Sequence, residues 1–281
     1  MFGEFLSAHA LNLACYGAFV AIFAGVERLR PVERQSPRAF LFNLSLFSLL
    51  YLGLSGYYYE MSKLHRYVAN LREVHFGVSD FVGRDLGTIG LTLRFVLFVL
   101  AADLIKYWMH RAMHQVPLFW RFHRAHHSDR HLNASTNLRE QWAGTLYGDA
   151  VFAVISAPLF GVLSLPIPLT AAYIAYGFFA HANLRISLGW LTPVFVGPQY
   201  HRIHHSRLPE HTNVNYASFF PLCDILFGTF YRPAANEFPP TGLIAEQHDS
   251  LWRIQLLTFE PVAAPKRRLA NRPNLVGTQQ L

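Results

Sequence analysis

Residues 103–128 read DLIKYWMHRAMHQVPLFWRFHRAHHS. The five histidines of this stretch follow two spacings, H-x-x-x-H at His110 and His114 and H-x-x-H-H at His123, His126 and His127. Side chains three or four residues apart lie on one face of a helix. Each cluster can therefore aim two or three imidazoles at one point, which is the geometry of metal ligands.

The same pattern returns later in the chain. A second H-x-x-H-H begins at His201, and a lone histidine, His181, lies between the two halves. Crowded imidazolium rings would repel one another, so such clusters indicate a cation that holds the rings neutral. The predicted metal ligands are His110, His114, His123, His126, His127, His181, His201, His204 and His205. The isolated histidines are expected in ordinary structural or loop positions: His9, His65, His75, His131, His211 and His248.

The composition indicates a membrane protein. The chain has 281 residues, of which 52% are hydrophobic, and its mean hydropathy is +0.20, which is high for a soluble enzyme. Residues 5–26 and 39–59 contain no Asp, Glu, Lys or Arg, so each is long enough to cross a bilayer. A third span, residues 86–109, carries Arg94, Asp103 and Lys106 and should turn this polar face toward protein.

The longest uncharged stretch lies between Asp149 and Arg185 and contains Pro158 and Pro166. Proline disrupts helices, so we expect a helical hairpin from about residue 143 to His181 with its turn at 165–168. A single span followed by a re-entrant segment is the alternative. The predicted fold is all-α, an integral membrane protein with about four to five membrane segments.

Basic residues suggest the orientation of these segments. The first loop carries four of them, Arg28, Arg30, Arg34 and Arg38, which the positive-inside rule places in the cytoplasm. Every histidine cluster would then lie at the cytoplasmic end of a helix, although the basic loop 60–85 would lie outside. The N-terminal apolar stretch is longer than the hydrophobic region of a signal peptide and is expected to remain as an anchor.

The remaining composition narrows the class of protein. A net charge of +7 suits an anionic membrane surface, and no motif for nucleic-acid binding is visible. The cysteines, Cys15 and Cys223, are far apart in sequence and are expected to be reduced.

Imidazole ligands favour iron, zinc, copper or nickel, and nine of them suit two ions better than one. The first cluster lacks the glutamate of H-E-x-x-H, which disfavours a metalloprotease.

These motifs together resemble the fatty acid hydroxylase superfamily, also called the sterol desaturase family. The resemblance rests on Asp103–His114, Trp120–Ser128, His201–Ser206, Asn215-Tyr216 and Asp224–Phe230 and covers roughly residues 90–232. It implies an integral membrane oxidoreductase with a di-iron centre on the cytoplasmic side. Such enzymes use dioxygen and electrons to hydroxylate or desaturate C–H bonds of lipids. A separate ferredoxin or cytochrome would donate the electrons, because this chain has no dinucleotide fingerprint.

The chain departs from the family pattern at residues 138–141, Leu-Arg-Glu-Gln. Many members have Arg-Phe-His here, so Gln141 stands where another histidine might have been. In this segment the chain resembles the branch of the family that contains alkylglycerol monooxygenase. The ligand set is then expected to close at nine histidines.

Three polar residues are expected to support the ligands. Asp103 lies two helical turns before His110 and could accept a ring N–H, Asp224 could do the same for the last cluster, and Asn183 could position His181. Trp108 and Trp120 are expected to anchor the chain at the membrane interface.

The sequence thus predicts membrane helices in residues 1–89, the di-metal domain in 90–232 and a tail in 233–281. Two alternatives to the di-iron oxygenase remain. The same imidazoles could hold zinc without redox chemistry. A metal transporter would place its ligands near the bilayer midplane, whereas these clusters flank the spans.

Overall fold

The computed structural model describes residues 2–70, 87–160, 167–244 and 250–261. Within these ranges the chain is all-helical and has no strand, only two isolated β-bridges. The α-helices are α1 (Phe2–Val26), α2 (Pro37–Gly53), α3 (Ser55–Asn70), α5 (Gly87–Gln115), α6 (Pro117–His127), α7 (Trp142–Phe160), α8 (Ile167–His181), α9 (Pro198–His204), α10 (Leu222–Leu226) and α11 (Leu251–Leu256). The predicted all-α class is confirmed.

The membrane segments are only partly as predicted. Among the described residues, α5 is the one single helix that is long and apolar enough to cross a membrane. The second predicted span, 39–59, is not one straight helix, because α2 and α3 meet at Leu54 with a bend of 60°. α1 is 25 residues long, and its described apolar part is Ala10–Val26. The two arms of the predicted hairpin correspond to α7 and α8, and its turn falls mostly on residues outside the described ranges.

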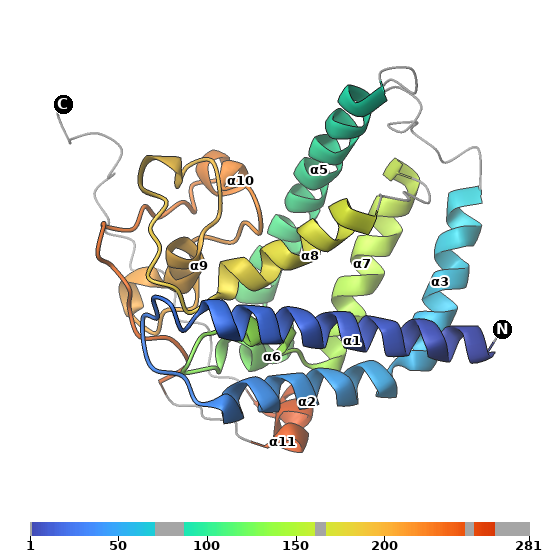
Figure 1. Cartoon of the computed structure of the whole chain (residues 1–281), viewed down its shortest axis with the longest axis horizontal. Helices are drawn as coiled ribbons and strands as arrows, with labels where there is room; N and C mark the ends of the chain where they lie inside the picture. Colours follow the sequence, from blue (N-terminus) through green and yellow to red (C-terminus); the bar gives the residue numbers. More distant parts are fainter. Residues whose placement is uncertain (1, 71–86, 161–166, 245–249, 262–281) are drawn as a thin grey trace.

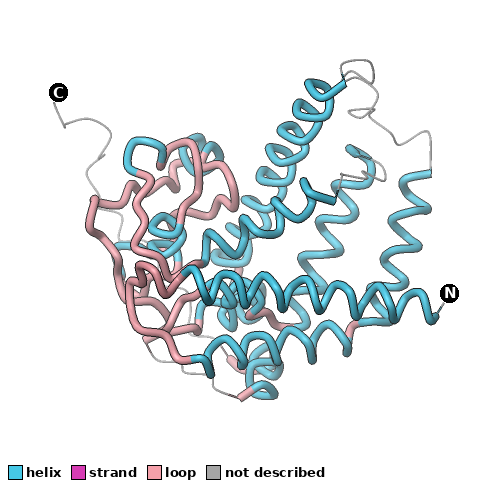
Figure 2. Tube along the Cα trace, in the orientation of Figure 1, coloured by secondary structure: helices cyan, strands magenta, loops and turns pink. Residues whose placement is uncertain are grey.

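The helices extend from a common end of the molecule. In Figure 1, α1 and α2 lie side by side, α8 crosses near them, and α5 and α7 rise from the same region. Figure 2 shows most of the loops gathered at this end. The histidine-bearing ends of α5, α6, α8 and α9 meet there, so the loops enclose the site while the apolar helices project away from it.

An aromatic core fixes α8 against the N-terminal helix. Phe178 of α8 is fully buried, and the rings of Phe19 and Phe23 stack on it with centroids 5.4 and 6.0 Å away. Buried Val20 and Leu138 belong to the same cluster. Such aromatic contacts bury large apolar areas, so they hold the helix that carries His181 in one position.

A buried carboxylate joins three distant segments next to this core. One oxygen of Glu27, which follows α1, accepts hydrogen bonds from the backbone N–H groups of Ala134 and Asn183 at 2.7 and 2.8 Å. Ala134 begins the short 3-10 helix η3 (Ala134–Leu138), and Asn183 follows α8. Burial raises the pKa of Glu27 to about 7. The carboxylate therefore links the end of α8 to the N-terminal half of the fold.

Candidate metal centre

Local sequence places the first two clusters. His110 and His114 lie in the last turns of α5, where their spacing puts both rings on one face. Val116 is extended, which is the conformation favoured before a proline. Pro117 is the first residue of α6, a position that proline favours. The chain therefore turns sharply, and His123 of α6 faces back toward His110 with their Nε2 atoms 3.0 Å apart.

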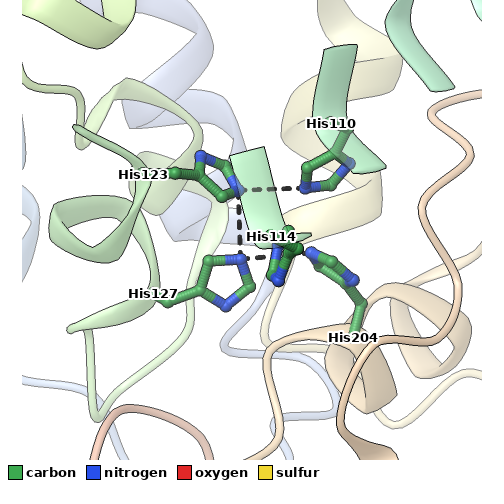
Figure 3. A group of neighbouring side chains, drawn as sticks. All are labelled: His110, His114, His123, His127 and His204. Atoms are coloured by element: carbon green, nitrogen blue, oxygen red, sulfur yellow. Dashed lines mark hydrogen bonds between the residues drawn. The ribbon is translucent and has the colours of Figure 1, made fainter. Parts of the chain in front are cut away.

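All nine predicted histidines come together in two adjacent groups. Possible ligand atoms within each group lie within 4.8 Å of one another. The first group, drawn in Figure 3, is His110, His114, His123, His127 and His204. The second group is His126, His181, His201 and His205. His127 and His205 join the groups, since their rings stack with centroids 4.3 Å apart.

Each H-x-x-H-H motif divides its histidines between the two groups. The residues four apart stay together, His123 with His127 in the first group and His201 with His205 in the second. The middle histidine goes to the opposite group. We expected each cluster to aim at one point, but the geometry of the motif allows it to serve two points.

The inward-facing nitrogen atoms have the spacing of ligands to a shared ion. In the first group the Nε2 distances are 3.0 Å for His110–His123, 3.2 Å for His123–His127 and 3.1 Å for His127–His204. In the second group they are 3.2 Å for His126–His181, 3.0 Å for His181–His201 and 3.2 Å for His201–His205. Nitrogen atoms bound about 2.0–2.1 Å from one ion lie roughly 3.0–3.4 Å apart. Both groups fit this geometry.

Backbone carbonyls fix the tautomer of three rings. The Nδ1 atoms of His110, His181 and His204 lie 2.8, 2.8 and 2.9 Å from the carbonyl oxygens of Tyr216, Gly177 and Val214. A carbonyl only accepts hydrogen bonds, so each Nδ1 carries the proton and each Nε2 presents a lone pair to the centre. One Nε2 atom cannot satisfy two close Nε2 neighbours by hydrogen bonding. A cation accepts lone pairs from all of them at once.

Burial keeps the rings neutral. Six histidines on α6 and at α9 have pKa values well below the usual range: His123, His126, His127, His201, His204 and His205. Loss of hydration on burial is the larger cause, and the neighbouring rings lower the pKa values further. Neutral imidazole is the form that binds metal. The site is therefore prepared to take up cations near neutral pH.

The metal-free protein should lose stability in acid. These six rings are neutral in the folded state and protonate with a pKa near 6.5 when unfolded, so stability present above about pH 6.5 is lost as the pH falls below it. Each ring that stays neutral costs up to about 1.4 kcal/mol per pH unit. The thermal midpoint of the metal-free chain in detergent should be lower at about pH 5.5 than at about pH 8. A His201→Asn/His205→Asn variant should show a smaller drop, and an equal or higher midpoint in acid would contradict the expectation.

The segment 213–217 supplies two of these carbonyls and is itself held by Asp224. The fully buried carboxylate accepts hydrogen bonds from the backbone N–H groups of Tyr216 and Ala217 at 2.8 and 2.7 Å. Asn213 and Asn215 adopt positive φ angles of 60° and 59°, which asparagine tolerates better than most residues. Asp224 was expected to contact a histidine, but it acts one step further back, on the backbone that orients His110 and His204.

Asp103 has a similar role and not the predicted one. Its carboxylate accepts hydrogen bonds from the backbone N–H groups of Ser218, Phe219 and Phe220, so it holds the continuation of the same segment. Asn183 exchanges hydrogen bonds with the backbone of Glu33, which ties the chain after His181 to the first loop. These contacts correct the expectation that Asp103 would accept a hydrogen bond from a ligand ring.

Trp120 lies against the first histidine group. Its ring lies 5.1 Å from that of His114 and 5.6 Å from that of His127, measured between centroids. Trp108 is 47% exposed and contacts Phe227. Trp120 thus covers one side of the histidine group, and the interfacial anchoring of both tryptophans stays a prediction.

Gln141 faces away from the histidines. Its Oε1 accepts from the backbone N–H groups of Ala143 and Gly144 at 2.8 and 3.2 Å, which caps the start of α7, and its Nε2 donates to the carbonyl of Gln255 at 3.0 Å. The neighbouring residue points the other way. Glu140 Oε1 lies 3.7 Å from Nδ1 of His126.

Glu140 was not among the predicted site residues, because the departure from the family pattern concerned the neighbouring Gln141. Burial, together with the nearby charge of Asp149, raises the pKa of Glu140 to about 8. This carboxyl and that of Glu27, whose pKa is also raised, gain stability as the pH falls and so oppose the acid lability of the six histidines in part. In the sequence, Glu140 stood out only as a charged residue just before the apolar residues of α7.

A histidine at position 141 should not become a ligand. In Gln141→His the ring would replace a cap that points away from the centre, so we expect unchanged metal content and a loss of about 1 kcal/mol in stability. Metal analysis and thermal unfolding check both parts. A gain of bound metal per chain would contradict the orientation seen for Gln141.

Two histidines outside the groups behave as loop or structural residues. The side chain of His131 is 63% exposed, near Glu33. His211 is buried, with Nδ1 2.9 Å from Ser206 Oγ and Nε2 3.0 Å from Glu237 Oε1. Neither residue joins the nine.

Residues 95–229 match the family model described as fatty acid hydroxylase. This region is similar to the fatty acid hydroxylase family. The match contains all nine grouped histidines, and the expected resemblance to the family and to its alkylglycerol monooxygenase branch is confirmed. No solved structure matches the chain.

Proteins similar to this region carry the names of lipid-modifying enzymes. Alkylglycerol monooxygenase of Caenorhabditis elegans is 33% identical over 151 residues, which are 52% of this chain and 28% of that protein. The human alkylglycerol monooxygenase is 32% identical over 167 residues, 58% of this chain and 34% of that protein. Ornithine lipid hydroxylase OlsE of Rhizobium tropici is 31% identical over 163 residues, 56% of this chain and 48% of that protein. The chain thus spans less than half the length of these relatives.

Proposed function

We propose that this chain is a membrane-bound lipid hydroxylase whose nine histidines hold two iron ions. The convergence of their Nε2 atoms in two groups, with spacings of 3.0 to 3.2 Å, is the observation that carries the proposal. The match to the fatty acid hydroxylase family model and the relatives named monooxygenase and hydroxylase support it.

The donor set fits iron better than a purely structural zinc site. Structural zinc takes four ligands, which the second group could provide, but the first group offers five. Imidazole suits both metals. A non-redox zinc protein therefore remains the competing function, and the nature of the bound metal decides between them.

When bound, iron would supply the activation of dioxygen that no side chain can provide. In the overall reaction one oxygen atom of O₂ enters a C–H bond to give C–OH and the other leaves as water. Two electrons and two protons complete the balance. The electrons would come from a separate donor such as a ferredoxin or cytochrome. Desaturation would be the variant outcome: with the same electrons and protons, hydrogen is removed from two adjacent carbons and both oxygen atoms leave as water.

The protein's own groups orient the ligands and exclude water. The carbonyls of Tyr216, Val214 and Gly177 hold three rings in the binding tautomer. Trp120 shields the first group. Such partners of ligand histidines typically change metal affinity by about 10–100-fold when removed.

We further propose four to five membrane segments with the metal centre on the cytoplasmic side. Support comes from the apolar helix α5, which ends at the histidines, and from the basic first loop at Arg28, Arg30, Arg34 and Arg38. Residues 90–232 would form the catalytic region, between N-terminal membrane helices and a C-terminal tail. Trp108, exposed beside this span, would lie at the interface.

The test combines metal and product. Protein purified without oxygen should contain two iron ions per chain and should convert a lipid only when both dioxygen and a reductant are added. Alkylglycerols and ornithine lipids are the first candidates, because relatives are named for them. Stoichiometric zinc with no oxygen consumption in the presence of a competent reductase would reject the proposal.

A further inference from the structure

Both H-x-x-H-H motifs carry an arginine directly after their first histidine. The motifs read His-Arg-Ala-His-His from His123 and His-Arg-Ile-His-His from His201, so the arginines are Arg124 and Arg202. Both are buried, with 2% and 3% of their surface exposed. Arginine is seldom buried this deeply, because a guanidinium that leaves water needs acceptors for its N–H groups. The partners of each arginine therefore show what the motif is attached to.

Arg202 joins the second motif to two distant parts of the chain. Its Nε donates to the carbonyl oxygen of Pro239 at 2.8 Å, and its Nη2 donates to Oε1 of Glu33 at 2.7 Å. Glu33 lies in the loop between α1 and α2, whereas Pro239 lies well after α10. A hydrogen bond between a guanidinium and a carboxylate is among the stronger ones in proteins. One side chain thus ties α9, the helix of His201 and His204, to segments on both sides of it in the sequence.

Arg124 makes corresponding contacts for the first motif. Its Nη2 donates to the carbonyl oxygens of Leu257 and Glu260 at 2.8 and 3.4 Å and lies 3.6 Å from the carboxylate of Glu260. Leu257 begins the short 3-10 helix η6 (Leu257–Phe259), and Glu260 follows it. Ala125, the next residue of the motif, belongs to the same buried apolar cluster as Leu257. Polar and apolar contacts together therefore fix α6 to the C-terminal segment.

The partners of both arginines lie outside the part of the chain that matches the family model. That part is residues 95–229, and it contains all nine grouped histidines. The acceptors lie before and after it, at Glu33, Pro239, Leu257 and Glu260. On a helix the arginine is rotated about 100° from the histidine before it, so it can bind these outer segments while the histidines face the centre.

We propose that Arg124 and Arg202 are positioning residues that set the ligand helices through segments outside residues 95–229. The first loop at Glu33 and the C-terminal residues 239–260 are then working parts of the metal centre. Each motif gives histidines to both groups, so loosening either helix should disturb both groups. This inference rests on the proposed function in one respect, that the histidines bind metal, and it requires neither iron nor dioxygen.

Cobalt binding tests the inference without turnover. The full chain in non-ionic detergent would be freed of metal and titrated with Co²⁺ without oxygen, because the visible spectrum of Co²⁺ reports the geometry of its ligands. Arg202→Met should weaken Co²⁺ binding about 10–100-fold, as loss of an outer partner of a ligand typically does. It should also change the spectrum at saturating Co²⁺, which a general loss of stability would not do. Arg124→Met should behave in the same way.

Further variants separate positioning from a failure to fold. Arg202→Lys keeps the charge but loses the forked geometry, so we expect an intermediate loss of affinity. The side chain of Glu33 is 30% exposed, so Glu33→Gln should fold and weaken Co²⁺ binding about fivefold. This effect should vanish in the Arg202→Met background if Glu33 acts through Arg202. Arg207→Met is the matched control, because Arg207 is exposed and follows the second motif by two residues. It should leave affinity and spectrum unchanged.

Two results would overturn the inference. One is parental Co²⁺ affinity and spectrum in the Met variants, with thermal midpoints of the metal-free chains showing that they are folded. If a Met variant does not fold, Arg202→Lys and Glu33→Gln decide, and parental Co²⁺ binding in both is equally contrary. The other is an effect of Glu33→Gln that is the same with and without Arg202. Failure of the proposed function looks different, since a zinc protein without oxygen chemistry would still need both arginines to bind Co²⁺ normally.

Discussion

Replacing His201 with asparagine should empty one half of the metal centre and abolish turnover. His201 Nε2 lies 3.0 Å from that of His181 and 3.2 Å from that of His205, within a group of only four rings. Loss of an outer partner costs about 10–100-fold in activity, and loss of a ligand should cost at least 100-fold. Iron should fall from two ions toward one per chain, as measured by elemental analysis, with product formation measured by mass spectrometry.

The matched control for this change is His131→Asn. His131 follows the first H-x-x-H-H by four residues, but its side chain is 63% exposed and lies outside both groups. It should keep full iron and full activity. An unchanged iron content in His201→Asn, or an equal loss in both variants, would contradict the assignment of the ligands.

Replacing Asp224 with asparagine should destabilise the fold and loosen the metal centre together. Besides two backbone N–H groups, the carboxylate accepts from the hydroxyls of Tyr200 and Thr229 at 2.7 and 2.6 Å, and it has no solvent exposure. The asparagine amide would place an N–H donor opposite N–H and O–H groups that are themselves donors. We expect a loss of about 3 kcal/mol or more in the free energy of unfolding.

Metal affinity should fall in the same Asp224→Asn variant, by about 10–100-fold, because the segment that it holds orients His110 and His204. Unfolding in mixed micelles and competition with a chelator measure the two effects. Glu210→Gln, an exposed acid in the loop before this segment, should leave both unchanged. Full stability of Asp224→Asn would show that the carboxylate does not hold the segment.

The grouping of the histidines was partly predictable from helical periodicity. Residues four apart share a face, so His123 with His127 and His201 with His205 had to stay together. His126 and His204 each lie about 100° around the helix from the histidine that follows them, which lets them join the adjacent group. A spacing of three residues would equally have allowed them to share a face with His123 and His201, so this assignment did not follow from periodicity. The lone His181 could be assigned only from its position at the end of an apolar arm.

Interactions between distant segments were not predictable from spacing. Asp103 lies seven residues before His110 and Asp224 nineteen residues after His205, and both accept hydrogen bonds from backbone N–H groups of the segment 216–220. Nothing in a single sequence tells which loop will lie against a buried carboxylate. The same limit applies to Leu138–Gln141, where the direction of Glu140 and Gln141 depends on how the residues before α7 pack against α6 and α11.

The bend between α2 and α3 has a different cause. Residues 39–59 are apolar enough for a span, and composition alone cannot reveal that the helix breaks at Leu54. Tertiary contacts decide this point: α3 packs against α7, which draws it away from the direction of α2.

Labelling the product with isotopically heavy dioxygen tests the central claim most directly. Iron-loaded protein in detergent, supplied with a reductant, a lipid and heavy dioxygen, should give an alcohol that carries one heavy oxygen atom. The same reaction with ordinary dioxygen in water labelled with heavy oxygen should leave the product unlabelled. Without dioxygen no product should form. A product labelled only from water, or full conversion by the zinc-loaded protein, would contradict an oxygen-activating iron centre built by the nine histidines.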